Sequence, residues 1–360
     1  MTFILFILVL GILVIVHEFG HFIFARYFGV KVDEFGFGFP PRLFGVKKGQ
    51  TLFSLNLFPL GGFVKIFGEE GEGKGDPSSF VSNSALRRAL IISAGVIMNL
   101  ILAWFLFSLI HFLGIPQAVE KDDLKAKNIK IQILAIQKDS PAEKSGLKIG
   151  DAILMLEQKN DVFKISENIP TEDVIKFIKE RAGRELVLQI LRGKEVIMIK
   201  AVPRENPPPR EGALGIAIER VGIAASPWYL APIDGLKTTF NTAALFLYSI
   251  FNIVKNLIIG QHQELGITGP IGIAVLTRDI YRLGFIYFLQ FIALISINLA
   301  VINIFPFPAL DGGRLLFIAI EKIKGSPVSQ SAEKITHAIG FALLIFLMIF
   351  VTFRDIQRFF

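Results

Sequence analysis

The sequence predicts a polytopic α-helical membrane protein of about four transmembrane helices, with a membrane-associated β-hairpin and an inserted α+β domain. Of its 360 residues, 52% are hydrophobic and 35 are phenylalanine, which is rare in a soluble chain of this length. Charged residues make up only 19% and gather in the middle of the chain and in short connectors. Long apolar stretches on both sides of that polar middle complete the pattern.

Each of the apolar stretches is long enough to cross about 30 Å of hydrocarbon. They lie at about Thr2–Phe28, Ala89–Leu113, Phe285–Phe305 and Ala338–Phe353. The first is not expected to be a cleaved signal peptide, because no positively charged segment precedes it and no small-residue cleavage site follows. We therefore expect these stretches to be membrane spans.

The polar block from about Gln117 to Gly222 has the pattern of a small α/β module, in which turn residues separate short runs of strand and helix. Strands are expected at Ile129–Ile136, Ala152–Leu156, Glu185–Leu191, Val196–Lys200 and Ala213–Ile218, and helices at Ser140–Gly146 and Thr171–Ala182. These elements predict three regions in the chain: 1–114, 115–222 and 223–360.

Two further segments have a membrane character without being spans. Leu236–Ile259 carries apolar residues at helical spacing, interrupted by polar ones, which favours an interfacial amphipathic helix. Phe53–Phe67 alternates apolar and polar residues around Pro59-Leu60-Gly61-Gly62, which predicts a β-hairpin turning at these residues. A hairpin at membrane depth needs protein or water to satisfy its edges.

Charge and cysteine content exclude several classes of function. The net charge is +7, but no basic patch interleaved with aromatic residues is present, so we expect no nucleic-acid partner. Lys and Arg between the spans are better explained by membrane topology and by contact with the lipid bilayer. With no cysteine, the chain forms no disulfide, cysteine nucleophile or cysteine-ligated metal site.

His17-Glu18-Phe19-Gly20-His21 is an HExxH motif inside the first apolar stretch. A four-residue step on a helix puts both imidazoles on one face, where they can bind one zinc ion, and places Glu18 within reach of the attacking water. Ionisable groups inside a span cost about 2.5–3.5 kcal/mol each on insertion scales, so three together need a reason. The alternative is a polar helix-packing cluster or a proton relay.

Asp311 is the expected third zinc ligand, since catalytic zinc usually takes three protein ligands. It follows a helix broken by Pro306 and Pro308, and the glycines after it allow a close backbone approach. The alternative is an ordinary turn in which Asp-Gly-Gly ends a helix. Together with HExxH, Asp311 predicts one Zn²⁺ per chain.

The order of the spans tests this pairing. The HExxH motif lies in the second half of the first span, nearer its exit side. If Leu236–Ile259 does not cross, the third span delivers Asp311 to that same side, and the polar module lies on the other side. The connector between the first two spans is rich in Lys and Arg, which places the zinc toward the cytoplasm and the module outside.

At this point the sequence resembles the site-2 protease family, and within it the bacterial regulator of sigma-E protease branch. The resemblance covers nearly the whole chain. It is carried by HExxH, the Gly-Phe-Gly-Phe run at Gly36–Phe39, the Pro-Leu-Gly-Gly run at Pro59–Gly62, the Ser-Ala-Gly run ending at Asn99, the Gly-Pro-Ile-Gly-Ile-Ala run at Gly269–Ala274, and the Asn-x-x-Pro-x-Pro-x-Leu-Asp-Gly-Gly motif ending at Gly313.

The resemblance implies an intramembrane zinc metalloendopeptidase in the bacterial cytoplasmic membrane. Its substrates would be transmembrane segments of single-span membrane proteins, such as anti-sigma factors or remnant signal peptides. Zinc would be held by His17, His21 and Asp311, with Glu18 as the general base and the Asn303 amide supporting the oxyanion. Substrate would be held extended against two glycine-rich stretches, namely Gly36 and Gly38, and Pro59, Gly61 and Gly62. The alternative for the hairpin is a structural plug over the zinc cavity.

The polar block resembles a PDZ domain. Ser140-Pro141-Ala142, Ser145-Gly146-Leu147 and Gly150-Asp151 carry the likeness, and Leu214, Gly215 and Ile216 look like its carboxylate-binding loop. The domain would bind the C-terminus of a peptide; the alternative is a β-turn without function. Two features depart from this branch. Proteobacterial members carry two tandem PDZ domains, whereas the polar block here has room for a single one, and Val96 stands where the family usually has proline.

Two other classes of function are open at this stage. A membrane-anchored PDZ adaptor with a dead metal site would be expected to have lost a ligand or Glu18. An ion or proton transporter using His17, Glu18 and Asp311 would be expected to show internal repeats and several charged spans. The sequence retains all of these residues, and it shows neither internal repeats nor several charged spans.

Overall fold

The computed structural model describes residues 2–118, 127–159, 161–193, 195–209, 211–260, 269–326 and 328–359. By backbone contacts the chain forms two compact units. The first comprises residues up to Ser108, Pro232–Asp279 and Leu289–Phe360, and the second comprises Leu109–Ala231 and Ile280–Phe288. We describe each unit by itself.

The long apolar helices belong mainly to the first unit. In the described residues, four helices have the length and composition to cross a membrane. They are α1 (Thr2–Tyr27), α2 (Ala85–Leu113), α7 (Phe285–Ile304) and α9 (Gln330–Phe359). These helices coincide with the expected apolar stretches and are consistent with a membrane protein with additional α+β content.

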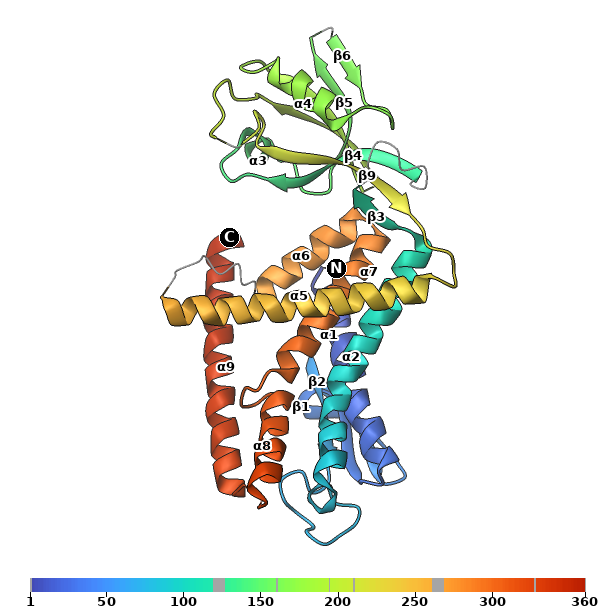
Figure 1. Cartoon of the computed structure of the whole chain (residues 1–360), viewed down its shortest axis with the longest axis vertical. Helices are drawn as coiled ribbons and strands as arrows, with labels where there is room; N and C mark the ends of the chain where they lie inside the picture. The colour runs from blue at the N-terminus through green and yellow to red at the C-terminus, as the bar shows by residue number, and fades with distance from the viewer. Residues whose placement is uncertain are drawn as a thin grey trace. The chain divides into compact units, whose positions relative to one another are not determined.

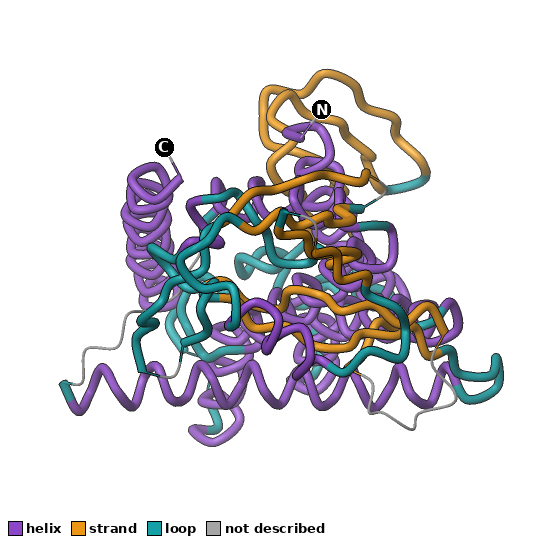
Figure 2. The backbone as a smooth tube through the Cα atoms, turned by 90° about the horizontal axis from the view of Figure 1, so that it is seen from above, coloured by secondary structure: helices purple, strands orange, loops and turns teal. Residues whose placement is uncertain are grey.

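Helix α5 (Ala231–Ile259) is not among those four candidate spans. Figures 1 and 2 both show α5 running crosswise to α9. Its N-terminal end is fixed to α2, where the Trp104 indole N–H donates a 2.8 Å hydrogen bond to the Pro232 carbonyl. Phe240, Tyr248 and Phe251 remain largely exposed along it. An apolar surface on a crosswise helix fits the expected interfacial helix.

Two shorter helices and a 3₁₀ turn complete the helical part of the first unit. They are α6 (Pro270–Leu283), α8 (Asp311–Lys324) and the turn at Phe80–Ser82. Asp311 is the first residue of α8, so Asp-Gly-Gly begins a helix here and does not end one.

Two long strands, β1 (Val32–Lys48) and β2 (Thr51–Ile66), pair with each other beside α1. The expected hairpin is wrong in its pairing, because among the described residues both arms of β2 pair with β1 and not with each other. The chain does reverse between Leu55 and Gly62, since residues 52–55 and 62–66 run in opposite directions on the two sides of β1. Another reversal, between β1 and β2, lies at Gly49-Gln50, where Gly49 has a φ of 63° and no atom lies within 4 Å of the position of a Cβ. A left-handed residue in open space suits a hairpin turn.

The register of this pair leaves few residues of β1 with an unpaired edge. Phe35 lies opposite both Phe53 and Val64, and Gly36 lies opposite both Ser54 and Phe63. The middle of β1 therefore has β2 on both sides. Among the described residues, the C-terminal part of β2 (residues 62–66) has a strand partner only in β1.

The second unit is built on an antiparallel sheet with strand order β3-β9-β4-β5-β7-β8, in which β6 also pairs with β5. The strands are β3 (Ile115–Ala118), β4 (Lys127–Ile136), β5 (Ala152–Gln158), β6 (Asp161–Lys164), β7 (Leu186–Arg192), β8 (Glu195–Ala201) and β9 (Ile216–Ala224), with helices α3 (Pro141–Lys144) and α4 (Thr171–Lys179). Ile133, Leu156 and Leu188 are fully buried in its core.

The expected last strand, Ala213–Ile218, is misplaced: the strand begins at Ile216 and continues to Ala224. Gly215 has a φ of 74°, and its N–H donates to the Gly212 carbonyl, so the chain turns immediately before the strand. The short strands β3 and β6 were not expected, because four residues are too few to show a period.

Candidate metal centre

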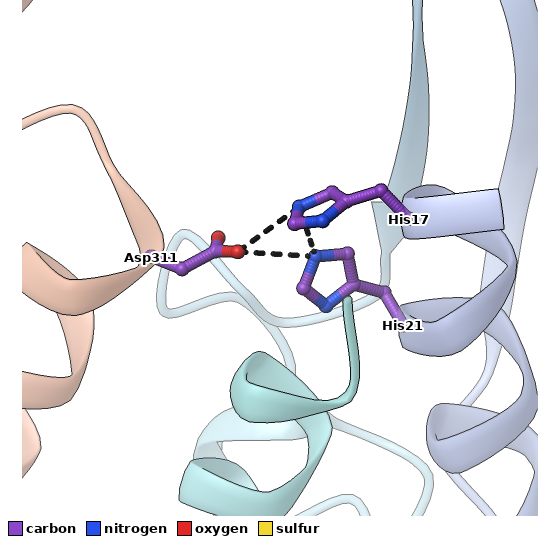
Figure 3. Close-up of side chains that lie close together, drawn as sticks. All are labelled: His17, His21 and Asp311. Carbon is purple, nitrogen blue, oxygen red and sulfur yellow. Dashed lines mark hydrogen bonds and ion pairs between the residues drawn. The ribbon is translucent and has the colours of Figure 1, made fainter. Parts of the chain in front are cut away.

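Helix α1 presents His17 and His21 on one face, one helical turn apart. Their Nε2 atoms are 3.2 Å apart. Asp311, at the start of α8, points its Oδ2 at both rings, 3.1 Å from His17 Nε2 and 3.4 Å from His21 Nε2 (Figure 3). Among the described residues, these three form the group of side chains that is close enough to hold one metal ion.

The backbone of α2 determines which nitrogen of His21 can bind a metal. His21 Nδ1 donates a 2.9 Å hydrogen bond to the Ile91 carbonyl, so the neutral ring keeps its lone pair on Nε2. That lone pair faces Asp311 Oδ2, which is buried and also an acceptor. Two acceptors that face each other need a cation between them. The residues therefore fit a zinc ion, which imidazole and carboxylate ligands bind well.

Asn99 of α2 supports His17 in a similar way. Its side chain is fully buried, with the amide nitrogen 3.4 Å from His17 Nδ1. Asn99 Oδ1 has no hydrogen-bond partner in the part of the chain that the structure describes. A half-turn of the amide lets Oδ1 accept the Nδ1–H of His17, which leaves the Nε2 lone pair for the metal.

The carboxylate ligand is kept ionised by its neighbours. Burial raises the pKa of Asp311, but when His17 and His21 are protonated and no metal lies between them and Asp311, their hydrogen bonds and charge outweigh burial and hold the pKa of this carboxyl below its usual range. Asp311 is thus available as an anionic ligand.

Close packing by glycines brings the three ligands together. A Cβ on Gly95 of α2 would lie 2.4 Å from His21 Nε2 and 2.8 Å from His17 Nε2, and a Cβ on Gly20 would lie 2.3 Å from the Ala94 carbonyl oxygen. On α8, a Cβ on Gly312 would lie 2.2 Å from the Phe305 carbonyl oxygen. Only glycine lets these backbones approach so closely.

A cavity of about 490 Å³ opens beside the three ligands. Glu18 lines it, as do Phe63 and Val64 of β2 and His337 of α9. Asn303, near the end of α7, places its amide nitrogen 3.5 Å from His17 Nε2. The expected base and the expected oxyanion donor therefore lie at the same centre as the three ligands.

The glycine-rich residues expected to hold substrate lie in β1 and β2. Gly62 is close to the base, since a Cβ there would lie 3.4 Å from Glu18 Cγ, whereas Gly61 packs under the Phe39 ring. Gly36 lies in the doubly paired middle of β1, and the Gly38 carbonyl accepts a 3.0 Å hydrogen bond from the Asn56 amide. Pro59 lies inside β2.

The three residues expected to bind a peptide carboxylate lie in the second unit. Leu214 is 1% exposed, in the core of that unit, and its carbonyl accepts from the Ala142 N–H. The N–H of Gly215 is already bonded to Gly212, and Ile216 begins β9.

His337 and Arg314 also line this cavity, and the sequence analysis did not single them out. His337 is a single histidine near the start of an apolar helix, and only the packing of α9 brings it to the cavity. Arg314, one turn after Asp311, lines the same cavity and pairs with Glu69. Its place next to the Asp-Gly-Gly motif was the available signal.

Residues 5–347 match Peptidase family M50. The chain belongs to this family. It is a zinc metalloprotease of the site-2 protease family, and the centre on α1 and α8 has the residue types that such an enzyme requires.

Several curated proteins are similar over nearly their whole length. "Zinc metalloprotease RasP" of Oceanobacillus iheyensis is 31% identical, with 100% of this chain and 99% of that protein covered. Two proteins named "Putative zinc metalloprotease" are also similar. The one from Nostoc sp. is 34% identical, covering 97% of this chain and 94% of its own length. The one from Clostridium acetobutylicum is 31% identical, covering 97% and 96%.

Proposed function

We propose that this metalloprotease is an endopeptidase that cleaves transmembrane segments of single-span membrane proteins, with one zinc ion per chain held by His17, His21 and Asp311. The observation that carries the proposal is the cavity that Glu18 shares with these ligands and with β2, in a unit whose long helices have the length and composition to cross a membrane. Anti-sigma factors and remnant signal peptides are the substrates expected from the family resemblance.

Each residue has a defined part in the reaction. Bound zinc supplies Lewis acidity, which acidifies water and polarises a carbonyl. Glu18 takes the proton of the attacking water and returns it to the leaving amine. The Asn303 amide, 3.5 Å from His17 Nε2, donates to the oxyanion that forms on the scissile carbonyl.

The substrate must be extended before it is cut, because a helix hides its carbonyls in internal hydrogen bonds. Residues 62–66 of β2 support a way to hold it extended. They line or adjoin the cavity and, among described residues, pair on one side only with β1. An extended segment would add to this edge as a further strand. In this arrangement Gly61 and Gly62 approach the substrate, while Gly36, Gly38 and Pro59 shape the sheet behind it.

The second unit is proposed to act as a PDZ domain over residues 115–222 that binds a peptide C-terminus. Its support is the strand β9, which begins immediately after the turn at Leu214-Gly215; the Gly215 N–H itself is bonded to the Gly212 carbonyl. Among described residues, β3 pairs only with Val221–Ala224 of β9, so Ile216–Arg220 has β4 as its strand partner on one side. Helix α4 lies against β9, as a peptide groove requires.

The order of the elements supports a proposed topology. With α1, α2, α7 and α9 as spans and α5 at the interface, the start of α8 lies on the same side as the end of α1. The connector between α1 and α2 is rich in Lys and Arg, which supports a cytoplasmic zinc side and an extracytoplasmic PDZ domain. The proposed location is the bacterial cytoplasmic membrane.

Cleavage and metal content of detergent-purified protein test the function. The wild type would be compared with Glu18→Gln, using a single-span peptide with helix-breaking residues as substrate. We expect about one zinc per chain in both proteins and cleavage only in the wild type. A folded wild type that binds zinc but cuts no membrane-spanning substrate, while cutting soluble peptides, would contradict intramembrane cleavage.

A further inference from the structure

His337 of α9 lines the cavity of the metal centre without being one of its three ligands. Its ring packs near Phe317 of α8, with the ring centroids 5.6 Å apart. The proposed mechanism gives this side chain no part, although it lies in the same cavity as Glu18 and Asp311.

The hydrogen bond on one side of the ring determines where its proton is. The backbone N–H of Ala309 donates to His337 Nδ1 over 2.8 Å. A nitrogen that accepts a hydrogen bond must carry the lone pair, so the ring is neutral and its proton lies on Nε2. That Nε2 is buried and has no hydrogen-bond partner among the residues described. The ring thus offers one unused N–H donor.

The same bond excludes His337 as a metal ligand. Ligation through Nε2 would require the proton to move to Nδ1, and the bond from Ala309 would then be lost. His337 therefore keeps the proton on Nε2, as a donor and not a metal ligand.

The ring is held firmly relative to the metal centre. Ala309 has a φ of 74°, a backbone conformation that a residue with a side chain adopts only when its surroundings enforce it. One turn beyond His337, Gly340 packs so closely on Pro308 that a Cβ would lie 2.4 Å from the proline Cβ. Two contacts thus join α9 to the loop immediately before Asp311.

The cavity has β2 on one side and α9 on another. Phe63, Val64 and Ile66 line it from β2, and His337, Ala338 and Phe341 line it from α9. An extended peptide that pairs with β2 through one edge presents the carbonyls of its other edge away from the strand. Those carbonyls need donors, since a buried carbonyl without a partner is costly.

We propose that His337 is a substrate-binding residue, whose Nε2–H donates a hydrogen bond to a backbone carbonyl of the peptide held extended in the cavity. This inference rests on the proposed function and adds a basis for its specificity. Because the acceptor is a main-chain carbonyl, the contact favours substrate segments that are unwound, whatever their side chains.

Two substitutions separate the two nitrogens of His337. In His337→Asn the amide oxygen takes the place of Nδ1, which keeps the bond from Ala309 and removes the donor. In His337→Gln the longer side chain can place an N–H near the position of Nε2, but the bond from Ala309 is lost. Zinc per chain, thermal midpoint, KM and kcat would be measured for both variants and the wild type.

For His337→Asn we expect the zinc content and thermal midpoint of the wild type, with KM raised about five- to tenfold. For His337→Gln we expect weaker zinc retention and, once zinc is resupplied, a KM close to that of the wild type. An unchanged KM in His337→Asn would overturn the inference, and so would loss of zinc from that variant, which would show a purely structural role.

The proposed function fails separately from this inference. If the wild type holds zinc and cleaves the membrane segment, and His337→Asn is equally active, only the donor role of His337 is contradicted. A wild type without cleavage of that segment removes the proposed function, and the inference with it.

Discussion

Gly95 of α2 lies so close to His21 that a Cβ at this position would be 2.4 Å from the Nε2 atom. No other residue fits between the helix and the imidazole. The metal centre therefore depends on a residue that contributes no ligand, and α2 acts as the surface against which both histidines are set.

Substitution of Gly95 by alanine should weaken zinc binding by at least about tenfold, because the added methyl group displaces both imidazoles. Zinc content after dialysis against a graded chelator series measures this effect. Ile97→Ala, on an exposed part of the same helix, is the control and should retain zinc. Equal retention by both variants would show that the imidazoles can move without loss of the site.

Asn99→Leu should reduce zinc affinity about 10- to 100-fold, the usual effect of removing a side chain that orients a metal ligand. Ser296→Ala is a matched control. The Ser296 hydroxyl donates to the backbone carbonyl of Asn99 over 2.7 Å, so its loss disturbs the same residue without touching the amide. If the two variants lose zinc equally, the effect comes from local packing and not from the contact with His17.

Asp355→Asn should lower the stability of the protein by about 1–3 kcal/mol. The buried Asp355 carboxylate on α9 accepts from the N–H groups of Gly269 and Gly272, 3.2 and 2.8 Å away, at the start of α6. An amide loses the favourable interaction of a negative charge with a helix N-terminus. Thermal unfolding in detergent measures the loss, and Asp279→Asn, at a more exposed position on α6, should change the midpoint little.

The interfacial position of α5 predicts which parts of the chain share a side of the membrane. Because the protein has no cysteine, single cysteines can be placed at the exposed positions Lys74, Lys144 and Lys324 and treated with a membrane-impermeant maleimide in intact spheroplasts. We expect Lys144→Cys to be labelled directly, and the other two only after permeabilisation. Direct labelling of Lys324→Cys with Lys144→Cys would mean that α5 crosses the membrane.

The helical framework could be predicted from the sequence because hydrocarbon thickness and helix geometry constrain it strongly. The four apolar helices appear where their composition placed them, with ends within a few residues except at α9, which extends from Gln330 to Phe359. The neighbouring positions of His17 and His21 also follow from sequence alone, since a four-residue step on a helix leaves no other arrangement.

The strands were harder to place, for a local reason. Proline and glycine at Pro59–Gly62 suggested a hairpin, yet the two arms around them lie on opposite sides of β1, and the turn between β1 and β2 is made at Gly49. In the second unit, the chain turns at Gly215, so β9 begins only at Ile216. A glycine can serve turning or close packing, and its sequence neighbours do not distinguish the two.

What the sequence by itself determined is the chemistry: membrane helices, an HExxH pair and a carboxylate that could join it. Only the tertiary structure decided how these groups meet, because contacts between distant segments depend on how backbones pack. It brings Asp311 Oδ2 to 3.1 Å from His17 Nε2, and joins His337 to Ala309 across 28 positions of sequence. No period or motif in the sequence encodes either of these distances.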